Sequence, residues 1–157
     1  MAPPTEPMAA TAVPEHRAWR LAIVGSRSLD GSPEALRVIR SVLDAHQARH
    51  AVLVVVSGGA VGIDRMAAAE ARRRGLQVIE HLPAGAGWRH YRERNQRIAR
   101  DCDELVRIAD PGSRTFGSGW TRDRARELGR PTTEYTVTGR PPAPRGPAAA
   151  ALRGNDA

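Results

Sequence analysis

Residues 51–62 read AVLVVVSGGAVG, an unbroken apolar run that stops abruptly at glycine. A segment that is apolar at every position, rather than at alternate positions, is typical of a central parallel strand covered by helices on both faces. Ile63, Met66 and Ala67 follow at helical spacing, which predicts a helix from about Val61. The stretch therefore predicts a strand, a tight turn and a helix, which are the parts of a βαβ unit.

The same alternation of apolar runs and helical spacing continues in both directions along the chain. Upstream, a run ends at Gly25, and Ser32 followed by Pro33 and Glu34 gives the N-cap signal of a helix. The predicted strands are 21–24, 51–56, 77–82, 104–108 and 133–137, with a helix in each interval. This order predicts an α/β, Rossmann-like three-layer fold with a mostly parallel five-stranded sheet and helices on both faces.

The two ends of the chain differ in composition from its middle. Residues 1–18 are rich in proline and small side chains, and residues 139–157 form a tail rich in proline and alanine. We expect both segments to be disordered, because neither has enough apolar side chains to bury. Residues 19–138 then form the single domain. No apolar run is long enough for a membrane span and no secretory signal is seen, so we expect a cytoplasmic protein with no membrane association.

Charge and residue usage exclude several kinds of chemistry. The formal net charge is +7, which attracts polyanions, although all 24 basic residues are arginine and a biased composition accounts for much of this count. Without lysine, the chain has neither a Walker A phosphate-binding lysine nor a Schiff-base lysine. Cys102 is the only cysteine, so no internal disulfide forms. No spacing of the five histidines completes a metal site, and we predict no metal.

Three glycine-rich loops follow predicted strands. They are Gly25-Ser26-Arg27, the segment 57–62, and the segment 112–119. In an open parallel sheet, ligands bind outside the carboxyl ends of the strands, where helix N-termini present free backbone amides to anions. Each loop alone is equally well explained as a tight turn, but three on one edge favour binding of a phosphate-bearing ligand. We therefore predict that the three loops meet there.

Several polar side chains near these loops are candidates for contact with the ligand. Asp64, in the first turn of the second helix, either binds a ribose or stabilises the helix dipole. Asn95 lies on the inward face of its helix and either ties down a loop or lines the pocket, because a buried amide needs hydrogen bonds. Arg94 can clamp a phosphate, although it is one of five similar arginines. Trp88 and Tyr91 either stack on a base or anchor the core.

The order of these motifs resembles the SLOG superfamily of Rossmann-like proteins, most closely its YspA-like branch. The matching residues are Gly25-Ser26-Arg27, Ser57-Gly58-Gly59-Ala60 with Gly62 and Asp64, Arg94-Asn95 with Ile98-Ala99, and Gly119-Trp120-Thr121 with Ala125 and Gly129. Relatives include the DNA-processing protein A group, which binds single-stranded DNA, and the Lonely Guy phosphoribohydrolases, which release a base from a nucleoside monophosphate. The resemblance implies a nucleotide-type ligand on the shared edge.

The sequence departs from the phosphoribohydrolases at one loop. Where they carry Pro-Gly-Gly-x-Gly-Thr before a catalytic glutamate, residues 111–116 read PGSRTF, and Glu127 lies farther along the chain. We therefore predict a binding or sensor domain for a nucleotide or nucleotide-derived phosphate compound, with no certain cofactor. The alternatives are a phosphoribohydrolase-like enzyme, with Arg94 and Asp64 as catalytic candidates, and single-stranded nucleic-acid binding. A homo-oligomer is expected from its general frequency.

The predicted ligand-binding residues come from all three loops and from the helices that follow them. They are Gly25, Ser26, Arg27, Ser57, Gly58, Gly59, Gly62, Asp64, Arg94, Asn95, Ser113, Thr115, Ser118 and Thr121.

Overall fold

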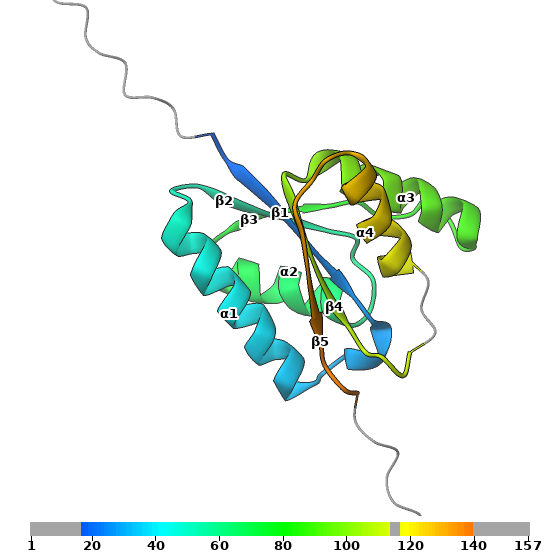
Figure 1. Cartoon of the computed structure of the whole chain (residues 1–157), viewed down its shortest axis with the longest axis horizontal. Coiled ribbons are helices and arrows are strands. Elements are labelled where there is room, and N and C mark those ends of the chain that lie inside the picture. Colours follow the sequence, from blue (N-terminus) through cyan, green and yellow to red (C-terminus); the bar gives the residue numbers. More distant parts are fainter. Residues whose placement is uncertain (1–16, 114–116, 140–157) are drawn as a thin grey trace, which may run out of the picture.

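The computed structural model describes residues 17–113 and 117–139, and these form one five-stranded sheet with helices on both sides (Figure 1). The expected disordered segments therefore lie, apart from residues 17, 18 and 139, outside the described residues. In chain order the elements are β1 (Trp19–Gly25), a 3-10 turn (Arg27–Leu29), α1 (Pro33–Arg49), β2 (Leu53–Ser57), α2 (Ile63–Arg73), β3 (Gln77–Glu80), α3 (Trp88–Asp101), β4 (Glu104–Ala109), α4 (Gly117–Glu127) and β5 (Thr132–Thr136).

All strand pairs in the sheet are parallel, and the strand order is β3-β2-β1-β4-β5. The chain therefore moves outward from β1 to β3, and then crosses back so that β4 lies on the other side of β1. The register aligns Leu21 with Glu104 and Gly25 with Ile108. This confirms the α/β, Rossmann-like prediction.

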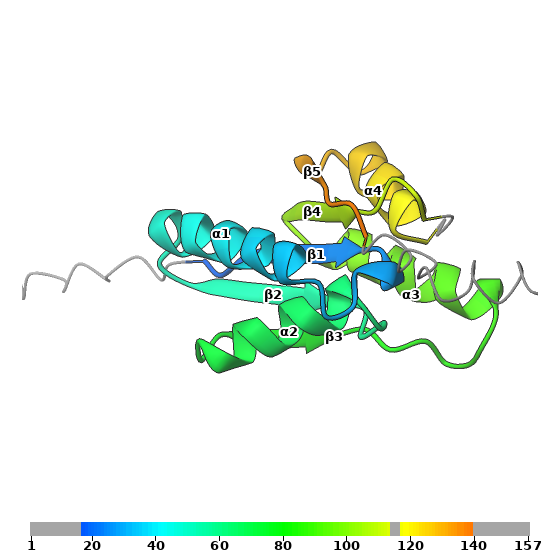
Figure 2. The same cartoon turned by 90° about the horizontal axis from the view of Figure 1, so that it is seen from below.

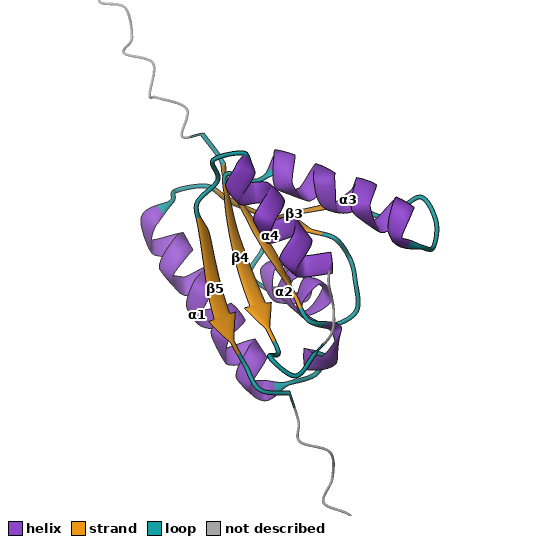
Figure 3. Ribbon diagram, turned by 45° about the vertical axis from the view of Figure 1, so that its right-hand side comes forward, coloured by secondary structure: helices purple, strands orange, loops and turns teal. Residues whose placement is uncertain are grey.

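Side chains of β1 alternate between two apolar layers. Leu21 and Ile23 point into the layer under α1 and α2, whereas Ala22 and Val24 point into the layer under α3 and α4. Figures 2 and 3 show the two pairs of helices separated by the sheet. Because β1 is covered on both faces and paired on both edges, its four apolar residues are fully or almost fully buried. The ends of this strand are thus held rigidly.

Helix ends follow the sequence signals closely. The Ser32 side chain accepts a hydrogen bond from the Ala35 backbone N–H at 3.2 Å, which is the predicted N-cap of α1. Helix α2 ends before Gly75, whose φ of +74° is left-handed. The second strand begins later than predicted, because Val52 lies in a bend and is 44% exposed. It also extends to Ser57, which pairs with Glu80 of β3.

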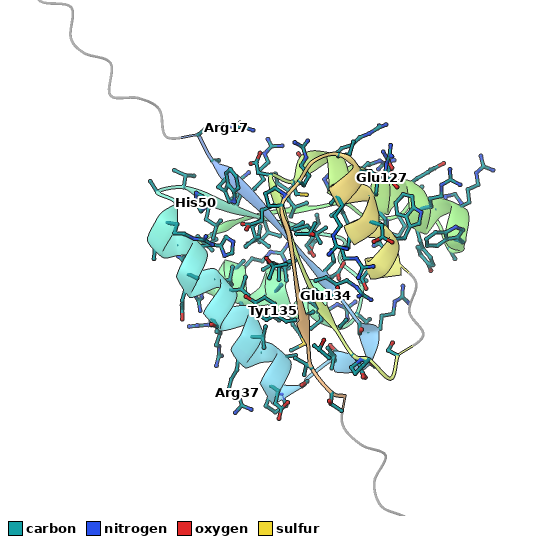
Figure 4. All side chains as sticks on the ribbon, viewed as in Figure 1. Arg17, Arg37, His50, Glu127, Glu134 and Tyr135 are labelled. Atoms are coloured by element: carbon teal, nitrogen blue, oxygen red, sulfur yellow. The ribbon has the colours of Figure 1, made fainter. Side chains whose placement is uncertain are left out.

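The histidines of α1 lie at the amino edge of the sheet, far from the predicted site. Figure 4 shows His50 at the C-terminal end of α1. Its ring stacks on Trp19 with centroids 4.7 Å apart. His46 is buried, and its Nδ1 and Nε2 atoms lie 2.7 Å from the Val42 carbonyl oxygen and 2.5 Å from a Glu104 carboxylate oxygen. These contacts join α1 to β1 and β4 and are structural.

Within the part of the chain that the structure describes, no helix has the length and apolar character that crossing a membrane requires.

Candidate functional site

A cavity of about 290 Å³ opens at the carboxyl end of β1. The chain leaves β1 and β4 in opposite directions along the sheet, which is the switch point where open parallel sheets bind ligands. Side chains of α3 and the first turns of α2 and α4 complete its walls. The cavity is lined by Val24, Gly25, Arg27, Ala60, Asp64, Trp88, Tyr91, Arg94, Asn95, Gly117, Ser118 and Thr121.

The loops after β1 and β4 are tied together by Asp110. The Asp110 backbone N–H donates to Ser26 Oγ at 2.9 Å, and Ser28 Oγ donates to the Asp110 carboxylate at 2.9 Å. The Gly112 N–H donates to the same carboxylate, and these hydrogen bonds, led by that of Gly112, hold the pKa of Asp110 below its usual value. Sequence reasoning missed Asp110, although aspartate before Pro-Gly is a turn signal.

The loop after β2 is packed against protein atoms along most of its length. Ser57 Oγ donates to the Asp64 carbonyl oxygen and accepts from the Gly59 N–H, both at 3.1 Å. A Cβ on Gly62, whose φ is +96°, would lie 2.5 Å from the Ser26 carbonyl oxygen. Position 57 therefore needs a small hydroxyl side chain, and position 62 needs glycine, for the loop to pack in this way. Ala60 is the residue of this loop that lines the cavity. A cavity lies at the predicted edge, but Ser26, Ser57, Gly58, Gly59 and Gly62 are not among the residues that line it.

Gly58 makes room for two buried charged groups. A Cβ at this position would lie 2.7 Å from Asp64 Oδ2 and 3.0 Å from Arg94 Nη1. The carboxylate and the guanidinium therefore converge on the same small region behind the cavity. This is a different use of the glycine from the predicted one, which was to leave space for a phosphate beside the backbone amides.

The carboxylate of Asp64 is almost completely buried. Its exposed fraction is 6%, and burial raises the pKa of this carboxyl to about 6. The positive charge of Arg94 and hydrogen bonds from the backbone of Gly25 and Gly58 oppose this rise. Asp64 is thus poised to change charge near neutral pH beside the cavity.

Arg94 is also 6% exposed, which separates it from the exposed arginines Arg92 and Arg97 of the same helix. Its Nε donates to Asn95 Oδ1 at 2.7 Å, and Nη1 donates to the Gly58 carbonyl oxygen. Burial, with a smaller effect of Arg27, lowers the pKa of Arg94, and Asp64 raises it. A guanidinium has five donors, so these two hydrogen bonds leave others for an acceptor in the cavity.

Asn95 has both roles that the sequence left open. Its amide nitrogen donates to the Gly117 carbonyl oxygen at 3.3 Å, which ties α3 to the start of α4, and its side chain lines the cavity. Thr121 Oγ1 donates to the same carbonyl oxygen at 2.8 Å. Ser118 Oγ accepts from Arg107 Nε at 3.0 Å. The first turn of α4 is therefore fixed by side chains of α3 and β4.

Two aromatic side chains stand at the rim of the cavity rather than in the core. The guanidinium carbons of Arg27 and Arg94 lie 5.6 Å and 5.7 Å from the centre of the Tyr91 ring, within cation–π distance. Trp88 is 46% exposed and lines the cavity from the first turn of α3. Of the two interpretations of these residues, core anchoring does not describe their position.

The third predicted loop contributes less than expected. The Ser113 N–H donates to the Asp110 carbonyl oxygen at 3.0 Å, and this residue is not among those lining the cavity. Thr115 lies outside the described residues. Within residues 17–113 and 117–139, no group of three or more His, Cys, Asp or Glu side chains could hold a metal ion.

The parallel sheet and the cavity at its switch point define a Rossmann-like α/β protein whose cavity is lined by residues of β1, α2, α3 and α4 and of the loops after β1 and β2. Residues 19–91 match the model of the family described as YAcAr: YspA, cpYpsA-related SLOG family. This match supports the resemblance to the YspA-like branch of the SLOG superfamily that the motifs show. The match suggests binding or processing of a nucleotide-related ligand. A search of curated proteins found no match.

Proposed function

We propose that this protein binds a nucleotide or a nucleotide-derived phosphate compound in the cavity at the end of β1. The observation that carries the proposal is Arg94, a buried guanidinium that faces a cavity. Burying a charge without a full set of partners costs free energy, and functional sites are where proteins retain such groups. Arg27 adds a second guanidinium to the same wall.

The charge balance of the cavity favours an anion. Arg27 and Arg94 are opposed in the lining by the single carboxyl group of Asp64, so the formal charge of the lining is positive. Guanidinium groups bind phosphate oxygens with two parallel hydrogen bonds, which gives both affinity and orientation. Asn95, Ser118 and Thr121 add polar atoms suited to the hydroxyl groups of a sugar.

The proposal is tested by binding of nucleotides to the full chain. Nucleoside monophosphates and ADP-ribose are expected to raise the melting temperature, because a ligand that binds only the folded state stabilises it. Arg27→Gln is expected to weaken binding about tenfold or more, since a hydrogen bond to a charged group contributes roughly 1.5–3 kcal/mol. Arg97→Gln is the matched control, because Arg97 is exposed on α3 and does not line the cavity.

No shift with any compound of the panel would contradict the proposal. Equal weakening by Arg27→Gln and Arg97→Gln would also contradict it, because the effect would then reflect net charge rather than the cavity.

A second candidate function is hydrolysis of the N-glycosidic bond of a nucleoside monophosphate. The observation that favours it is Asp64, a buried carboxyl group in the cavity wall opposite the guanidinium of Arg94. In this reaction Arg94 binds the phosphate, and ionised Asp64 stabilises positive charge on the ribose. Chromatography after long incubation is expected to detect free base, and Asp64→Asn is expected to abolish it. Absence of free base with the unmodified chain rejects the enzyme and leaves the binding proposal intact.

A further inference from the structure

Two tryptophans from different helices meet beside the cavity. Trp88 begins α3 and Trp120 lies in the first turn of α4, and these helices pack side by side (Figures 1 and 3). Their ring centroids are 6.0 Å apart at an interplanar angle of 87°, an edge-to-face pair. Such a pair leaves ring surface open on both indoles, and Trp88 is 46% exposed. Large apolar rings at the rim of a cavity that also holds two guanidinium groups point to a ligand with an aromatic group.

The tryptophan pair joins two cavities. Trp88 lines the cavity of about 290 Å³ described above, and Trp120 lines a second cavity of about 630 Å³ between α3 and α4. Within the second cavity, Arg124 contacts two other lining side chains. Arg124 donates to Gln96 at 2.9 Å and pairs with Glu127 at 2.6 Å. Figure 4 shows Glu127 at the C-terminal end of α4.

The two cavities therefore differ in charge. The first presents Arg27 and Arg94 against the single carboxyl group of Asp64 and suits a phosphate. The second presents three arginines and three carboxylates, so its formal charges balance; they are Arg92, Arg100 and Arg124 with Glu93, Asp123 and Glu127. A ligand that spans both cavities places its phosphate in the first and a neutral group in the second.

The volume of the first cavity also indicates that the phosphate and the base of the ligand lie in different places. The first cavity, at about 290 Å³, is just below the range of about 300–1,000 Å³ found for small-molecule sites. It accommodates a phosphorylated sugar, and a base attached to that sugar extends beyond the rim where Trp88 stands. The T-shaped pair then offers a ring face to the base.

From these contacts we infer that the ligand is a nucleotide whose aromatic base stacks on one indole of the Trp88–Trp120 pair, which the other indole holds in place by its edge-to-face contact, while the sugar phosphate occupies the first cavity. This inference rests on the proposed function and adds the part of the ligand that the pair recognises. Stacking of a base on an aromatic side chain does not depend strongly on base identity. The pair therefore selects for the presence of a base rather than for one base.

The test compares ribose 5-phosphate with the four nucleoside monophosphates, which differ from it by the base. Binding to the full chain is measured by calorimetry, and the nucleoside monophosphates are expected to bind about tenfold more tightly, within the range for one stacked base. Trp120→Leu is expected to lower their affinity to that of ribose 5-phosphate and to leave ribose 5-phosphate binding unchanged. Trp120→Phe, which keeps an aromatic ring, is expected to retain most of the preference.

Fluorescence supplies a second measurement that needs no change at the site. Trp19 lies at the opposite edge of the sheet, stacked on His50, so Trp19→Phe leaves Trp88 and Trp120 as the emitting residues. A nucleoside monophosphate is expected to quench this emission, whereas ribose 5-phosphate is expected to leave it nearly unchanged.

The outcomes separate the inference from the proposed function. Equal affinities for ribose 5-phosphate and the nucleoside monophosphates overturn the inference and leave phosphate binding standing. Equal weakening of both kinds of ligand by Trp120→Leu overturns it too, as does a nucleotide preference that survives in the folded Trp120→Leu variant. Failure of every compound to bind the unmodified chain overturns the proposed function, and the inference with it.

Discussion

Replacing Asp64 with asparagine removes a negative charge from a buried position in the cavity wall. Burial raises the pKa of this carboxyl from 3.8 to about 6 in the folded protein. Between these two values the folded state holds the proton more tightly than the unfolded state does. The free energy of unfolding therefore falls as the pH rises from 3.8 to about 6, and the loss is complete above the folded pKa.

The size of this effect follows from the pKa values. At 1.36 kcal/mol for each pKa unit, a rise from 3.8 to about 6 corresponds to about 3 kcal/mol of destabilisation at neutral pH. The neutral side chain in Asp64→Asn avoids this cost. The variant is thus expected to gain stability relative to the unmodified protein as the pH increases, and to reach a relative gain of about 3 kcal/mol above pH 7.

The assay is urea unfolding followed by circular dichroism at about pH 4.5 and about pH 8, where roughly 2 kcal/mol of the relative gain should appear. Comparing the two pH values cancels any difference in hydrogen bonding between asparagine and a neutral carboxyl. Asp30→Asn is the control, because Asp30 is an exposed carboxylate near the same edge. A stability difference that does not change with pH, or that changes in the opposite direction, would refute the reasoning, since attraction to Arg94 would then offset burial.

Three further predictions concern the rest of the fold. Gly62→Ala is expected to lower the free energy of unfolding by more than about 2 kcal/mol, because alanine is strained at this φ and its Cβ meets the backbone after β1. Gly75→Ala has open space around the added Cβ and is expected to cost only the backbone strain, about 1 kcal/mol. Equal losses in thermal unfolding would count against the packing argument. Burial raises the pKa of the Cys102 thiol to about 12, so the native protein should react with a thiol reagent only as fast as it unfolds; rapid labelling without denaturant would disprove this. Glu104→Gln is expected to destabilise the protein by roughly 1–3 kcal/mol in urea, because it disrupts the buried contact with His46; a neutral effect would show that this contact is dispensable.

The architecture could be predicted from the sequence because local signals agreed with one another. The apolar run before Ser57, the cap at Ser32 and the glycine at Gly75 each determine a local conformation, and their order leaves few topologies. Strand ends were less predictable. Val52 is apolar but lies in a bend, because pairing with the neighbouring strands, rather than hydrophobicity, decides where β2 begins.

The site could be predicted only in part, because burial of a polar side chain depends on distant segments. Helical spacing placed Asn95 on the inward face, but nothing local separates Arg94 from the exposed Arg97. Arg94 is buried because its guanidinium reaches the Gly58 carbonyl oxygen, which β2 places beside α3. Likewise, the meeting of Trp88 and Trp120 depends on the packing of α3 against α4, which neither segment encodes alone.

The central position of β1 has a consequence for synthesis of the chain. One neighbour, β2, follows after α1, but the other, β4, begins at Glu104. A nascent chain that has left the ribosome only as far as Tyr91 has no β4 or α4, so the face of the sheet bearing Ala22, Val24 and Val56 has no helix to cover it. We therefore expect that residues 19–91 do not fold on their own, since the cavity wall also needs Arg94, Asn95 and the first turn of α4.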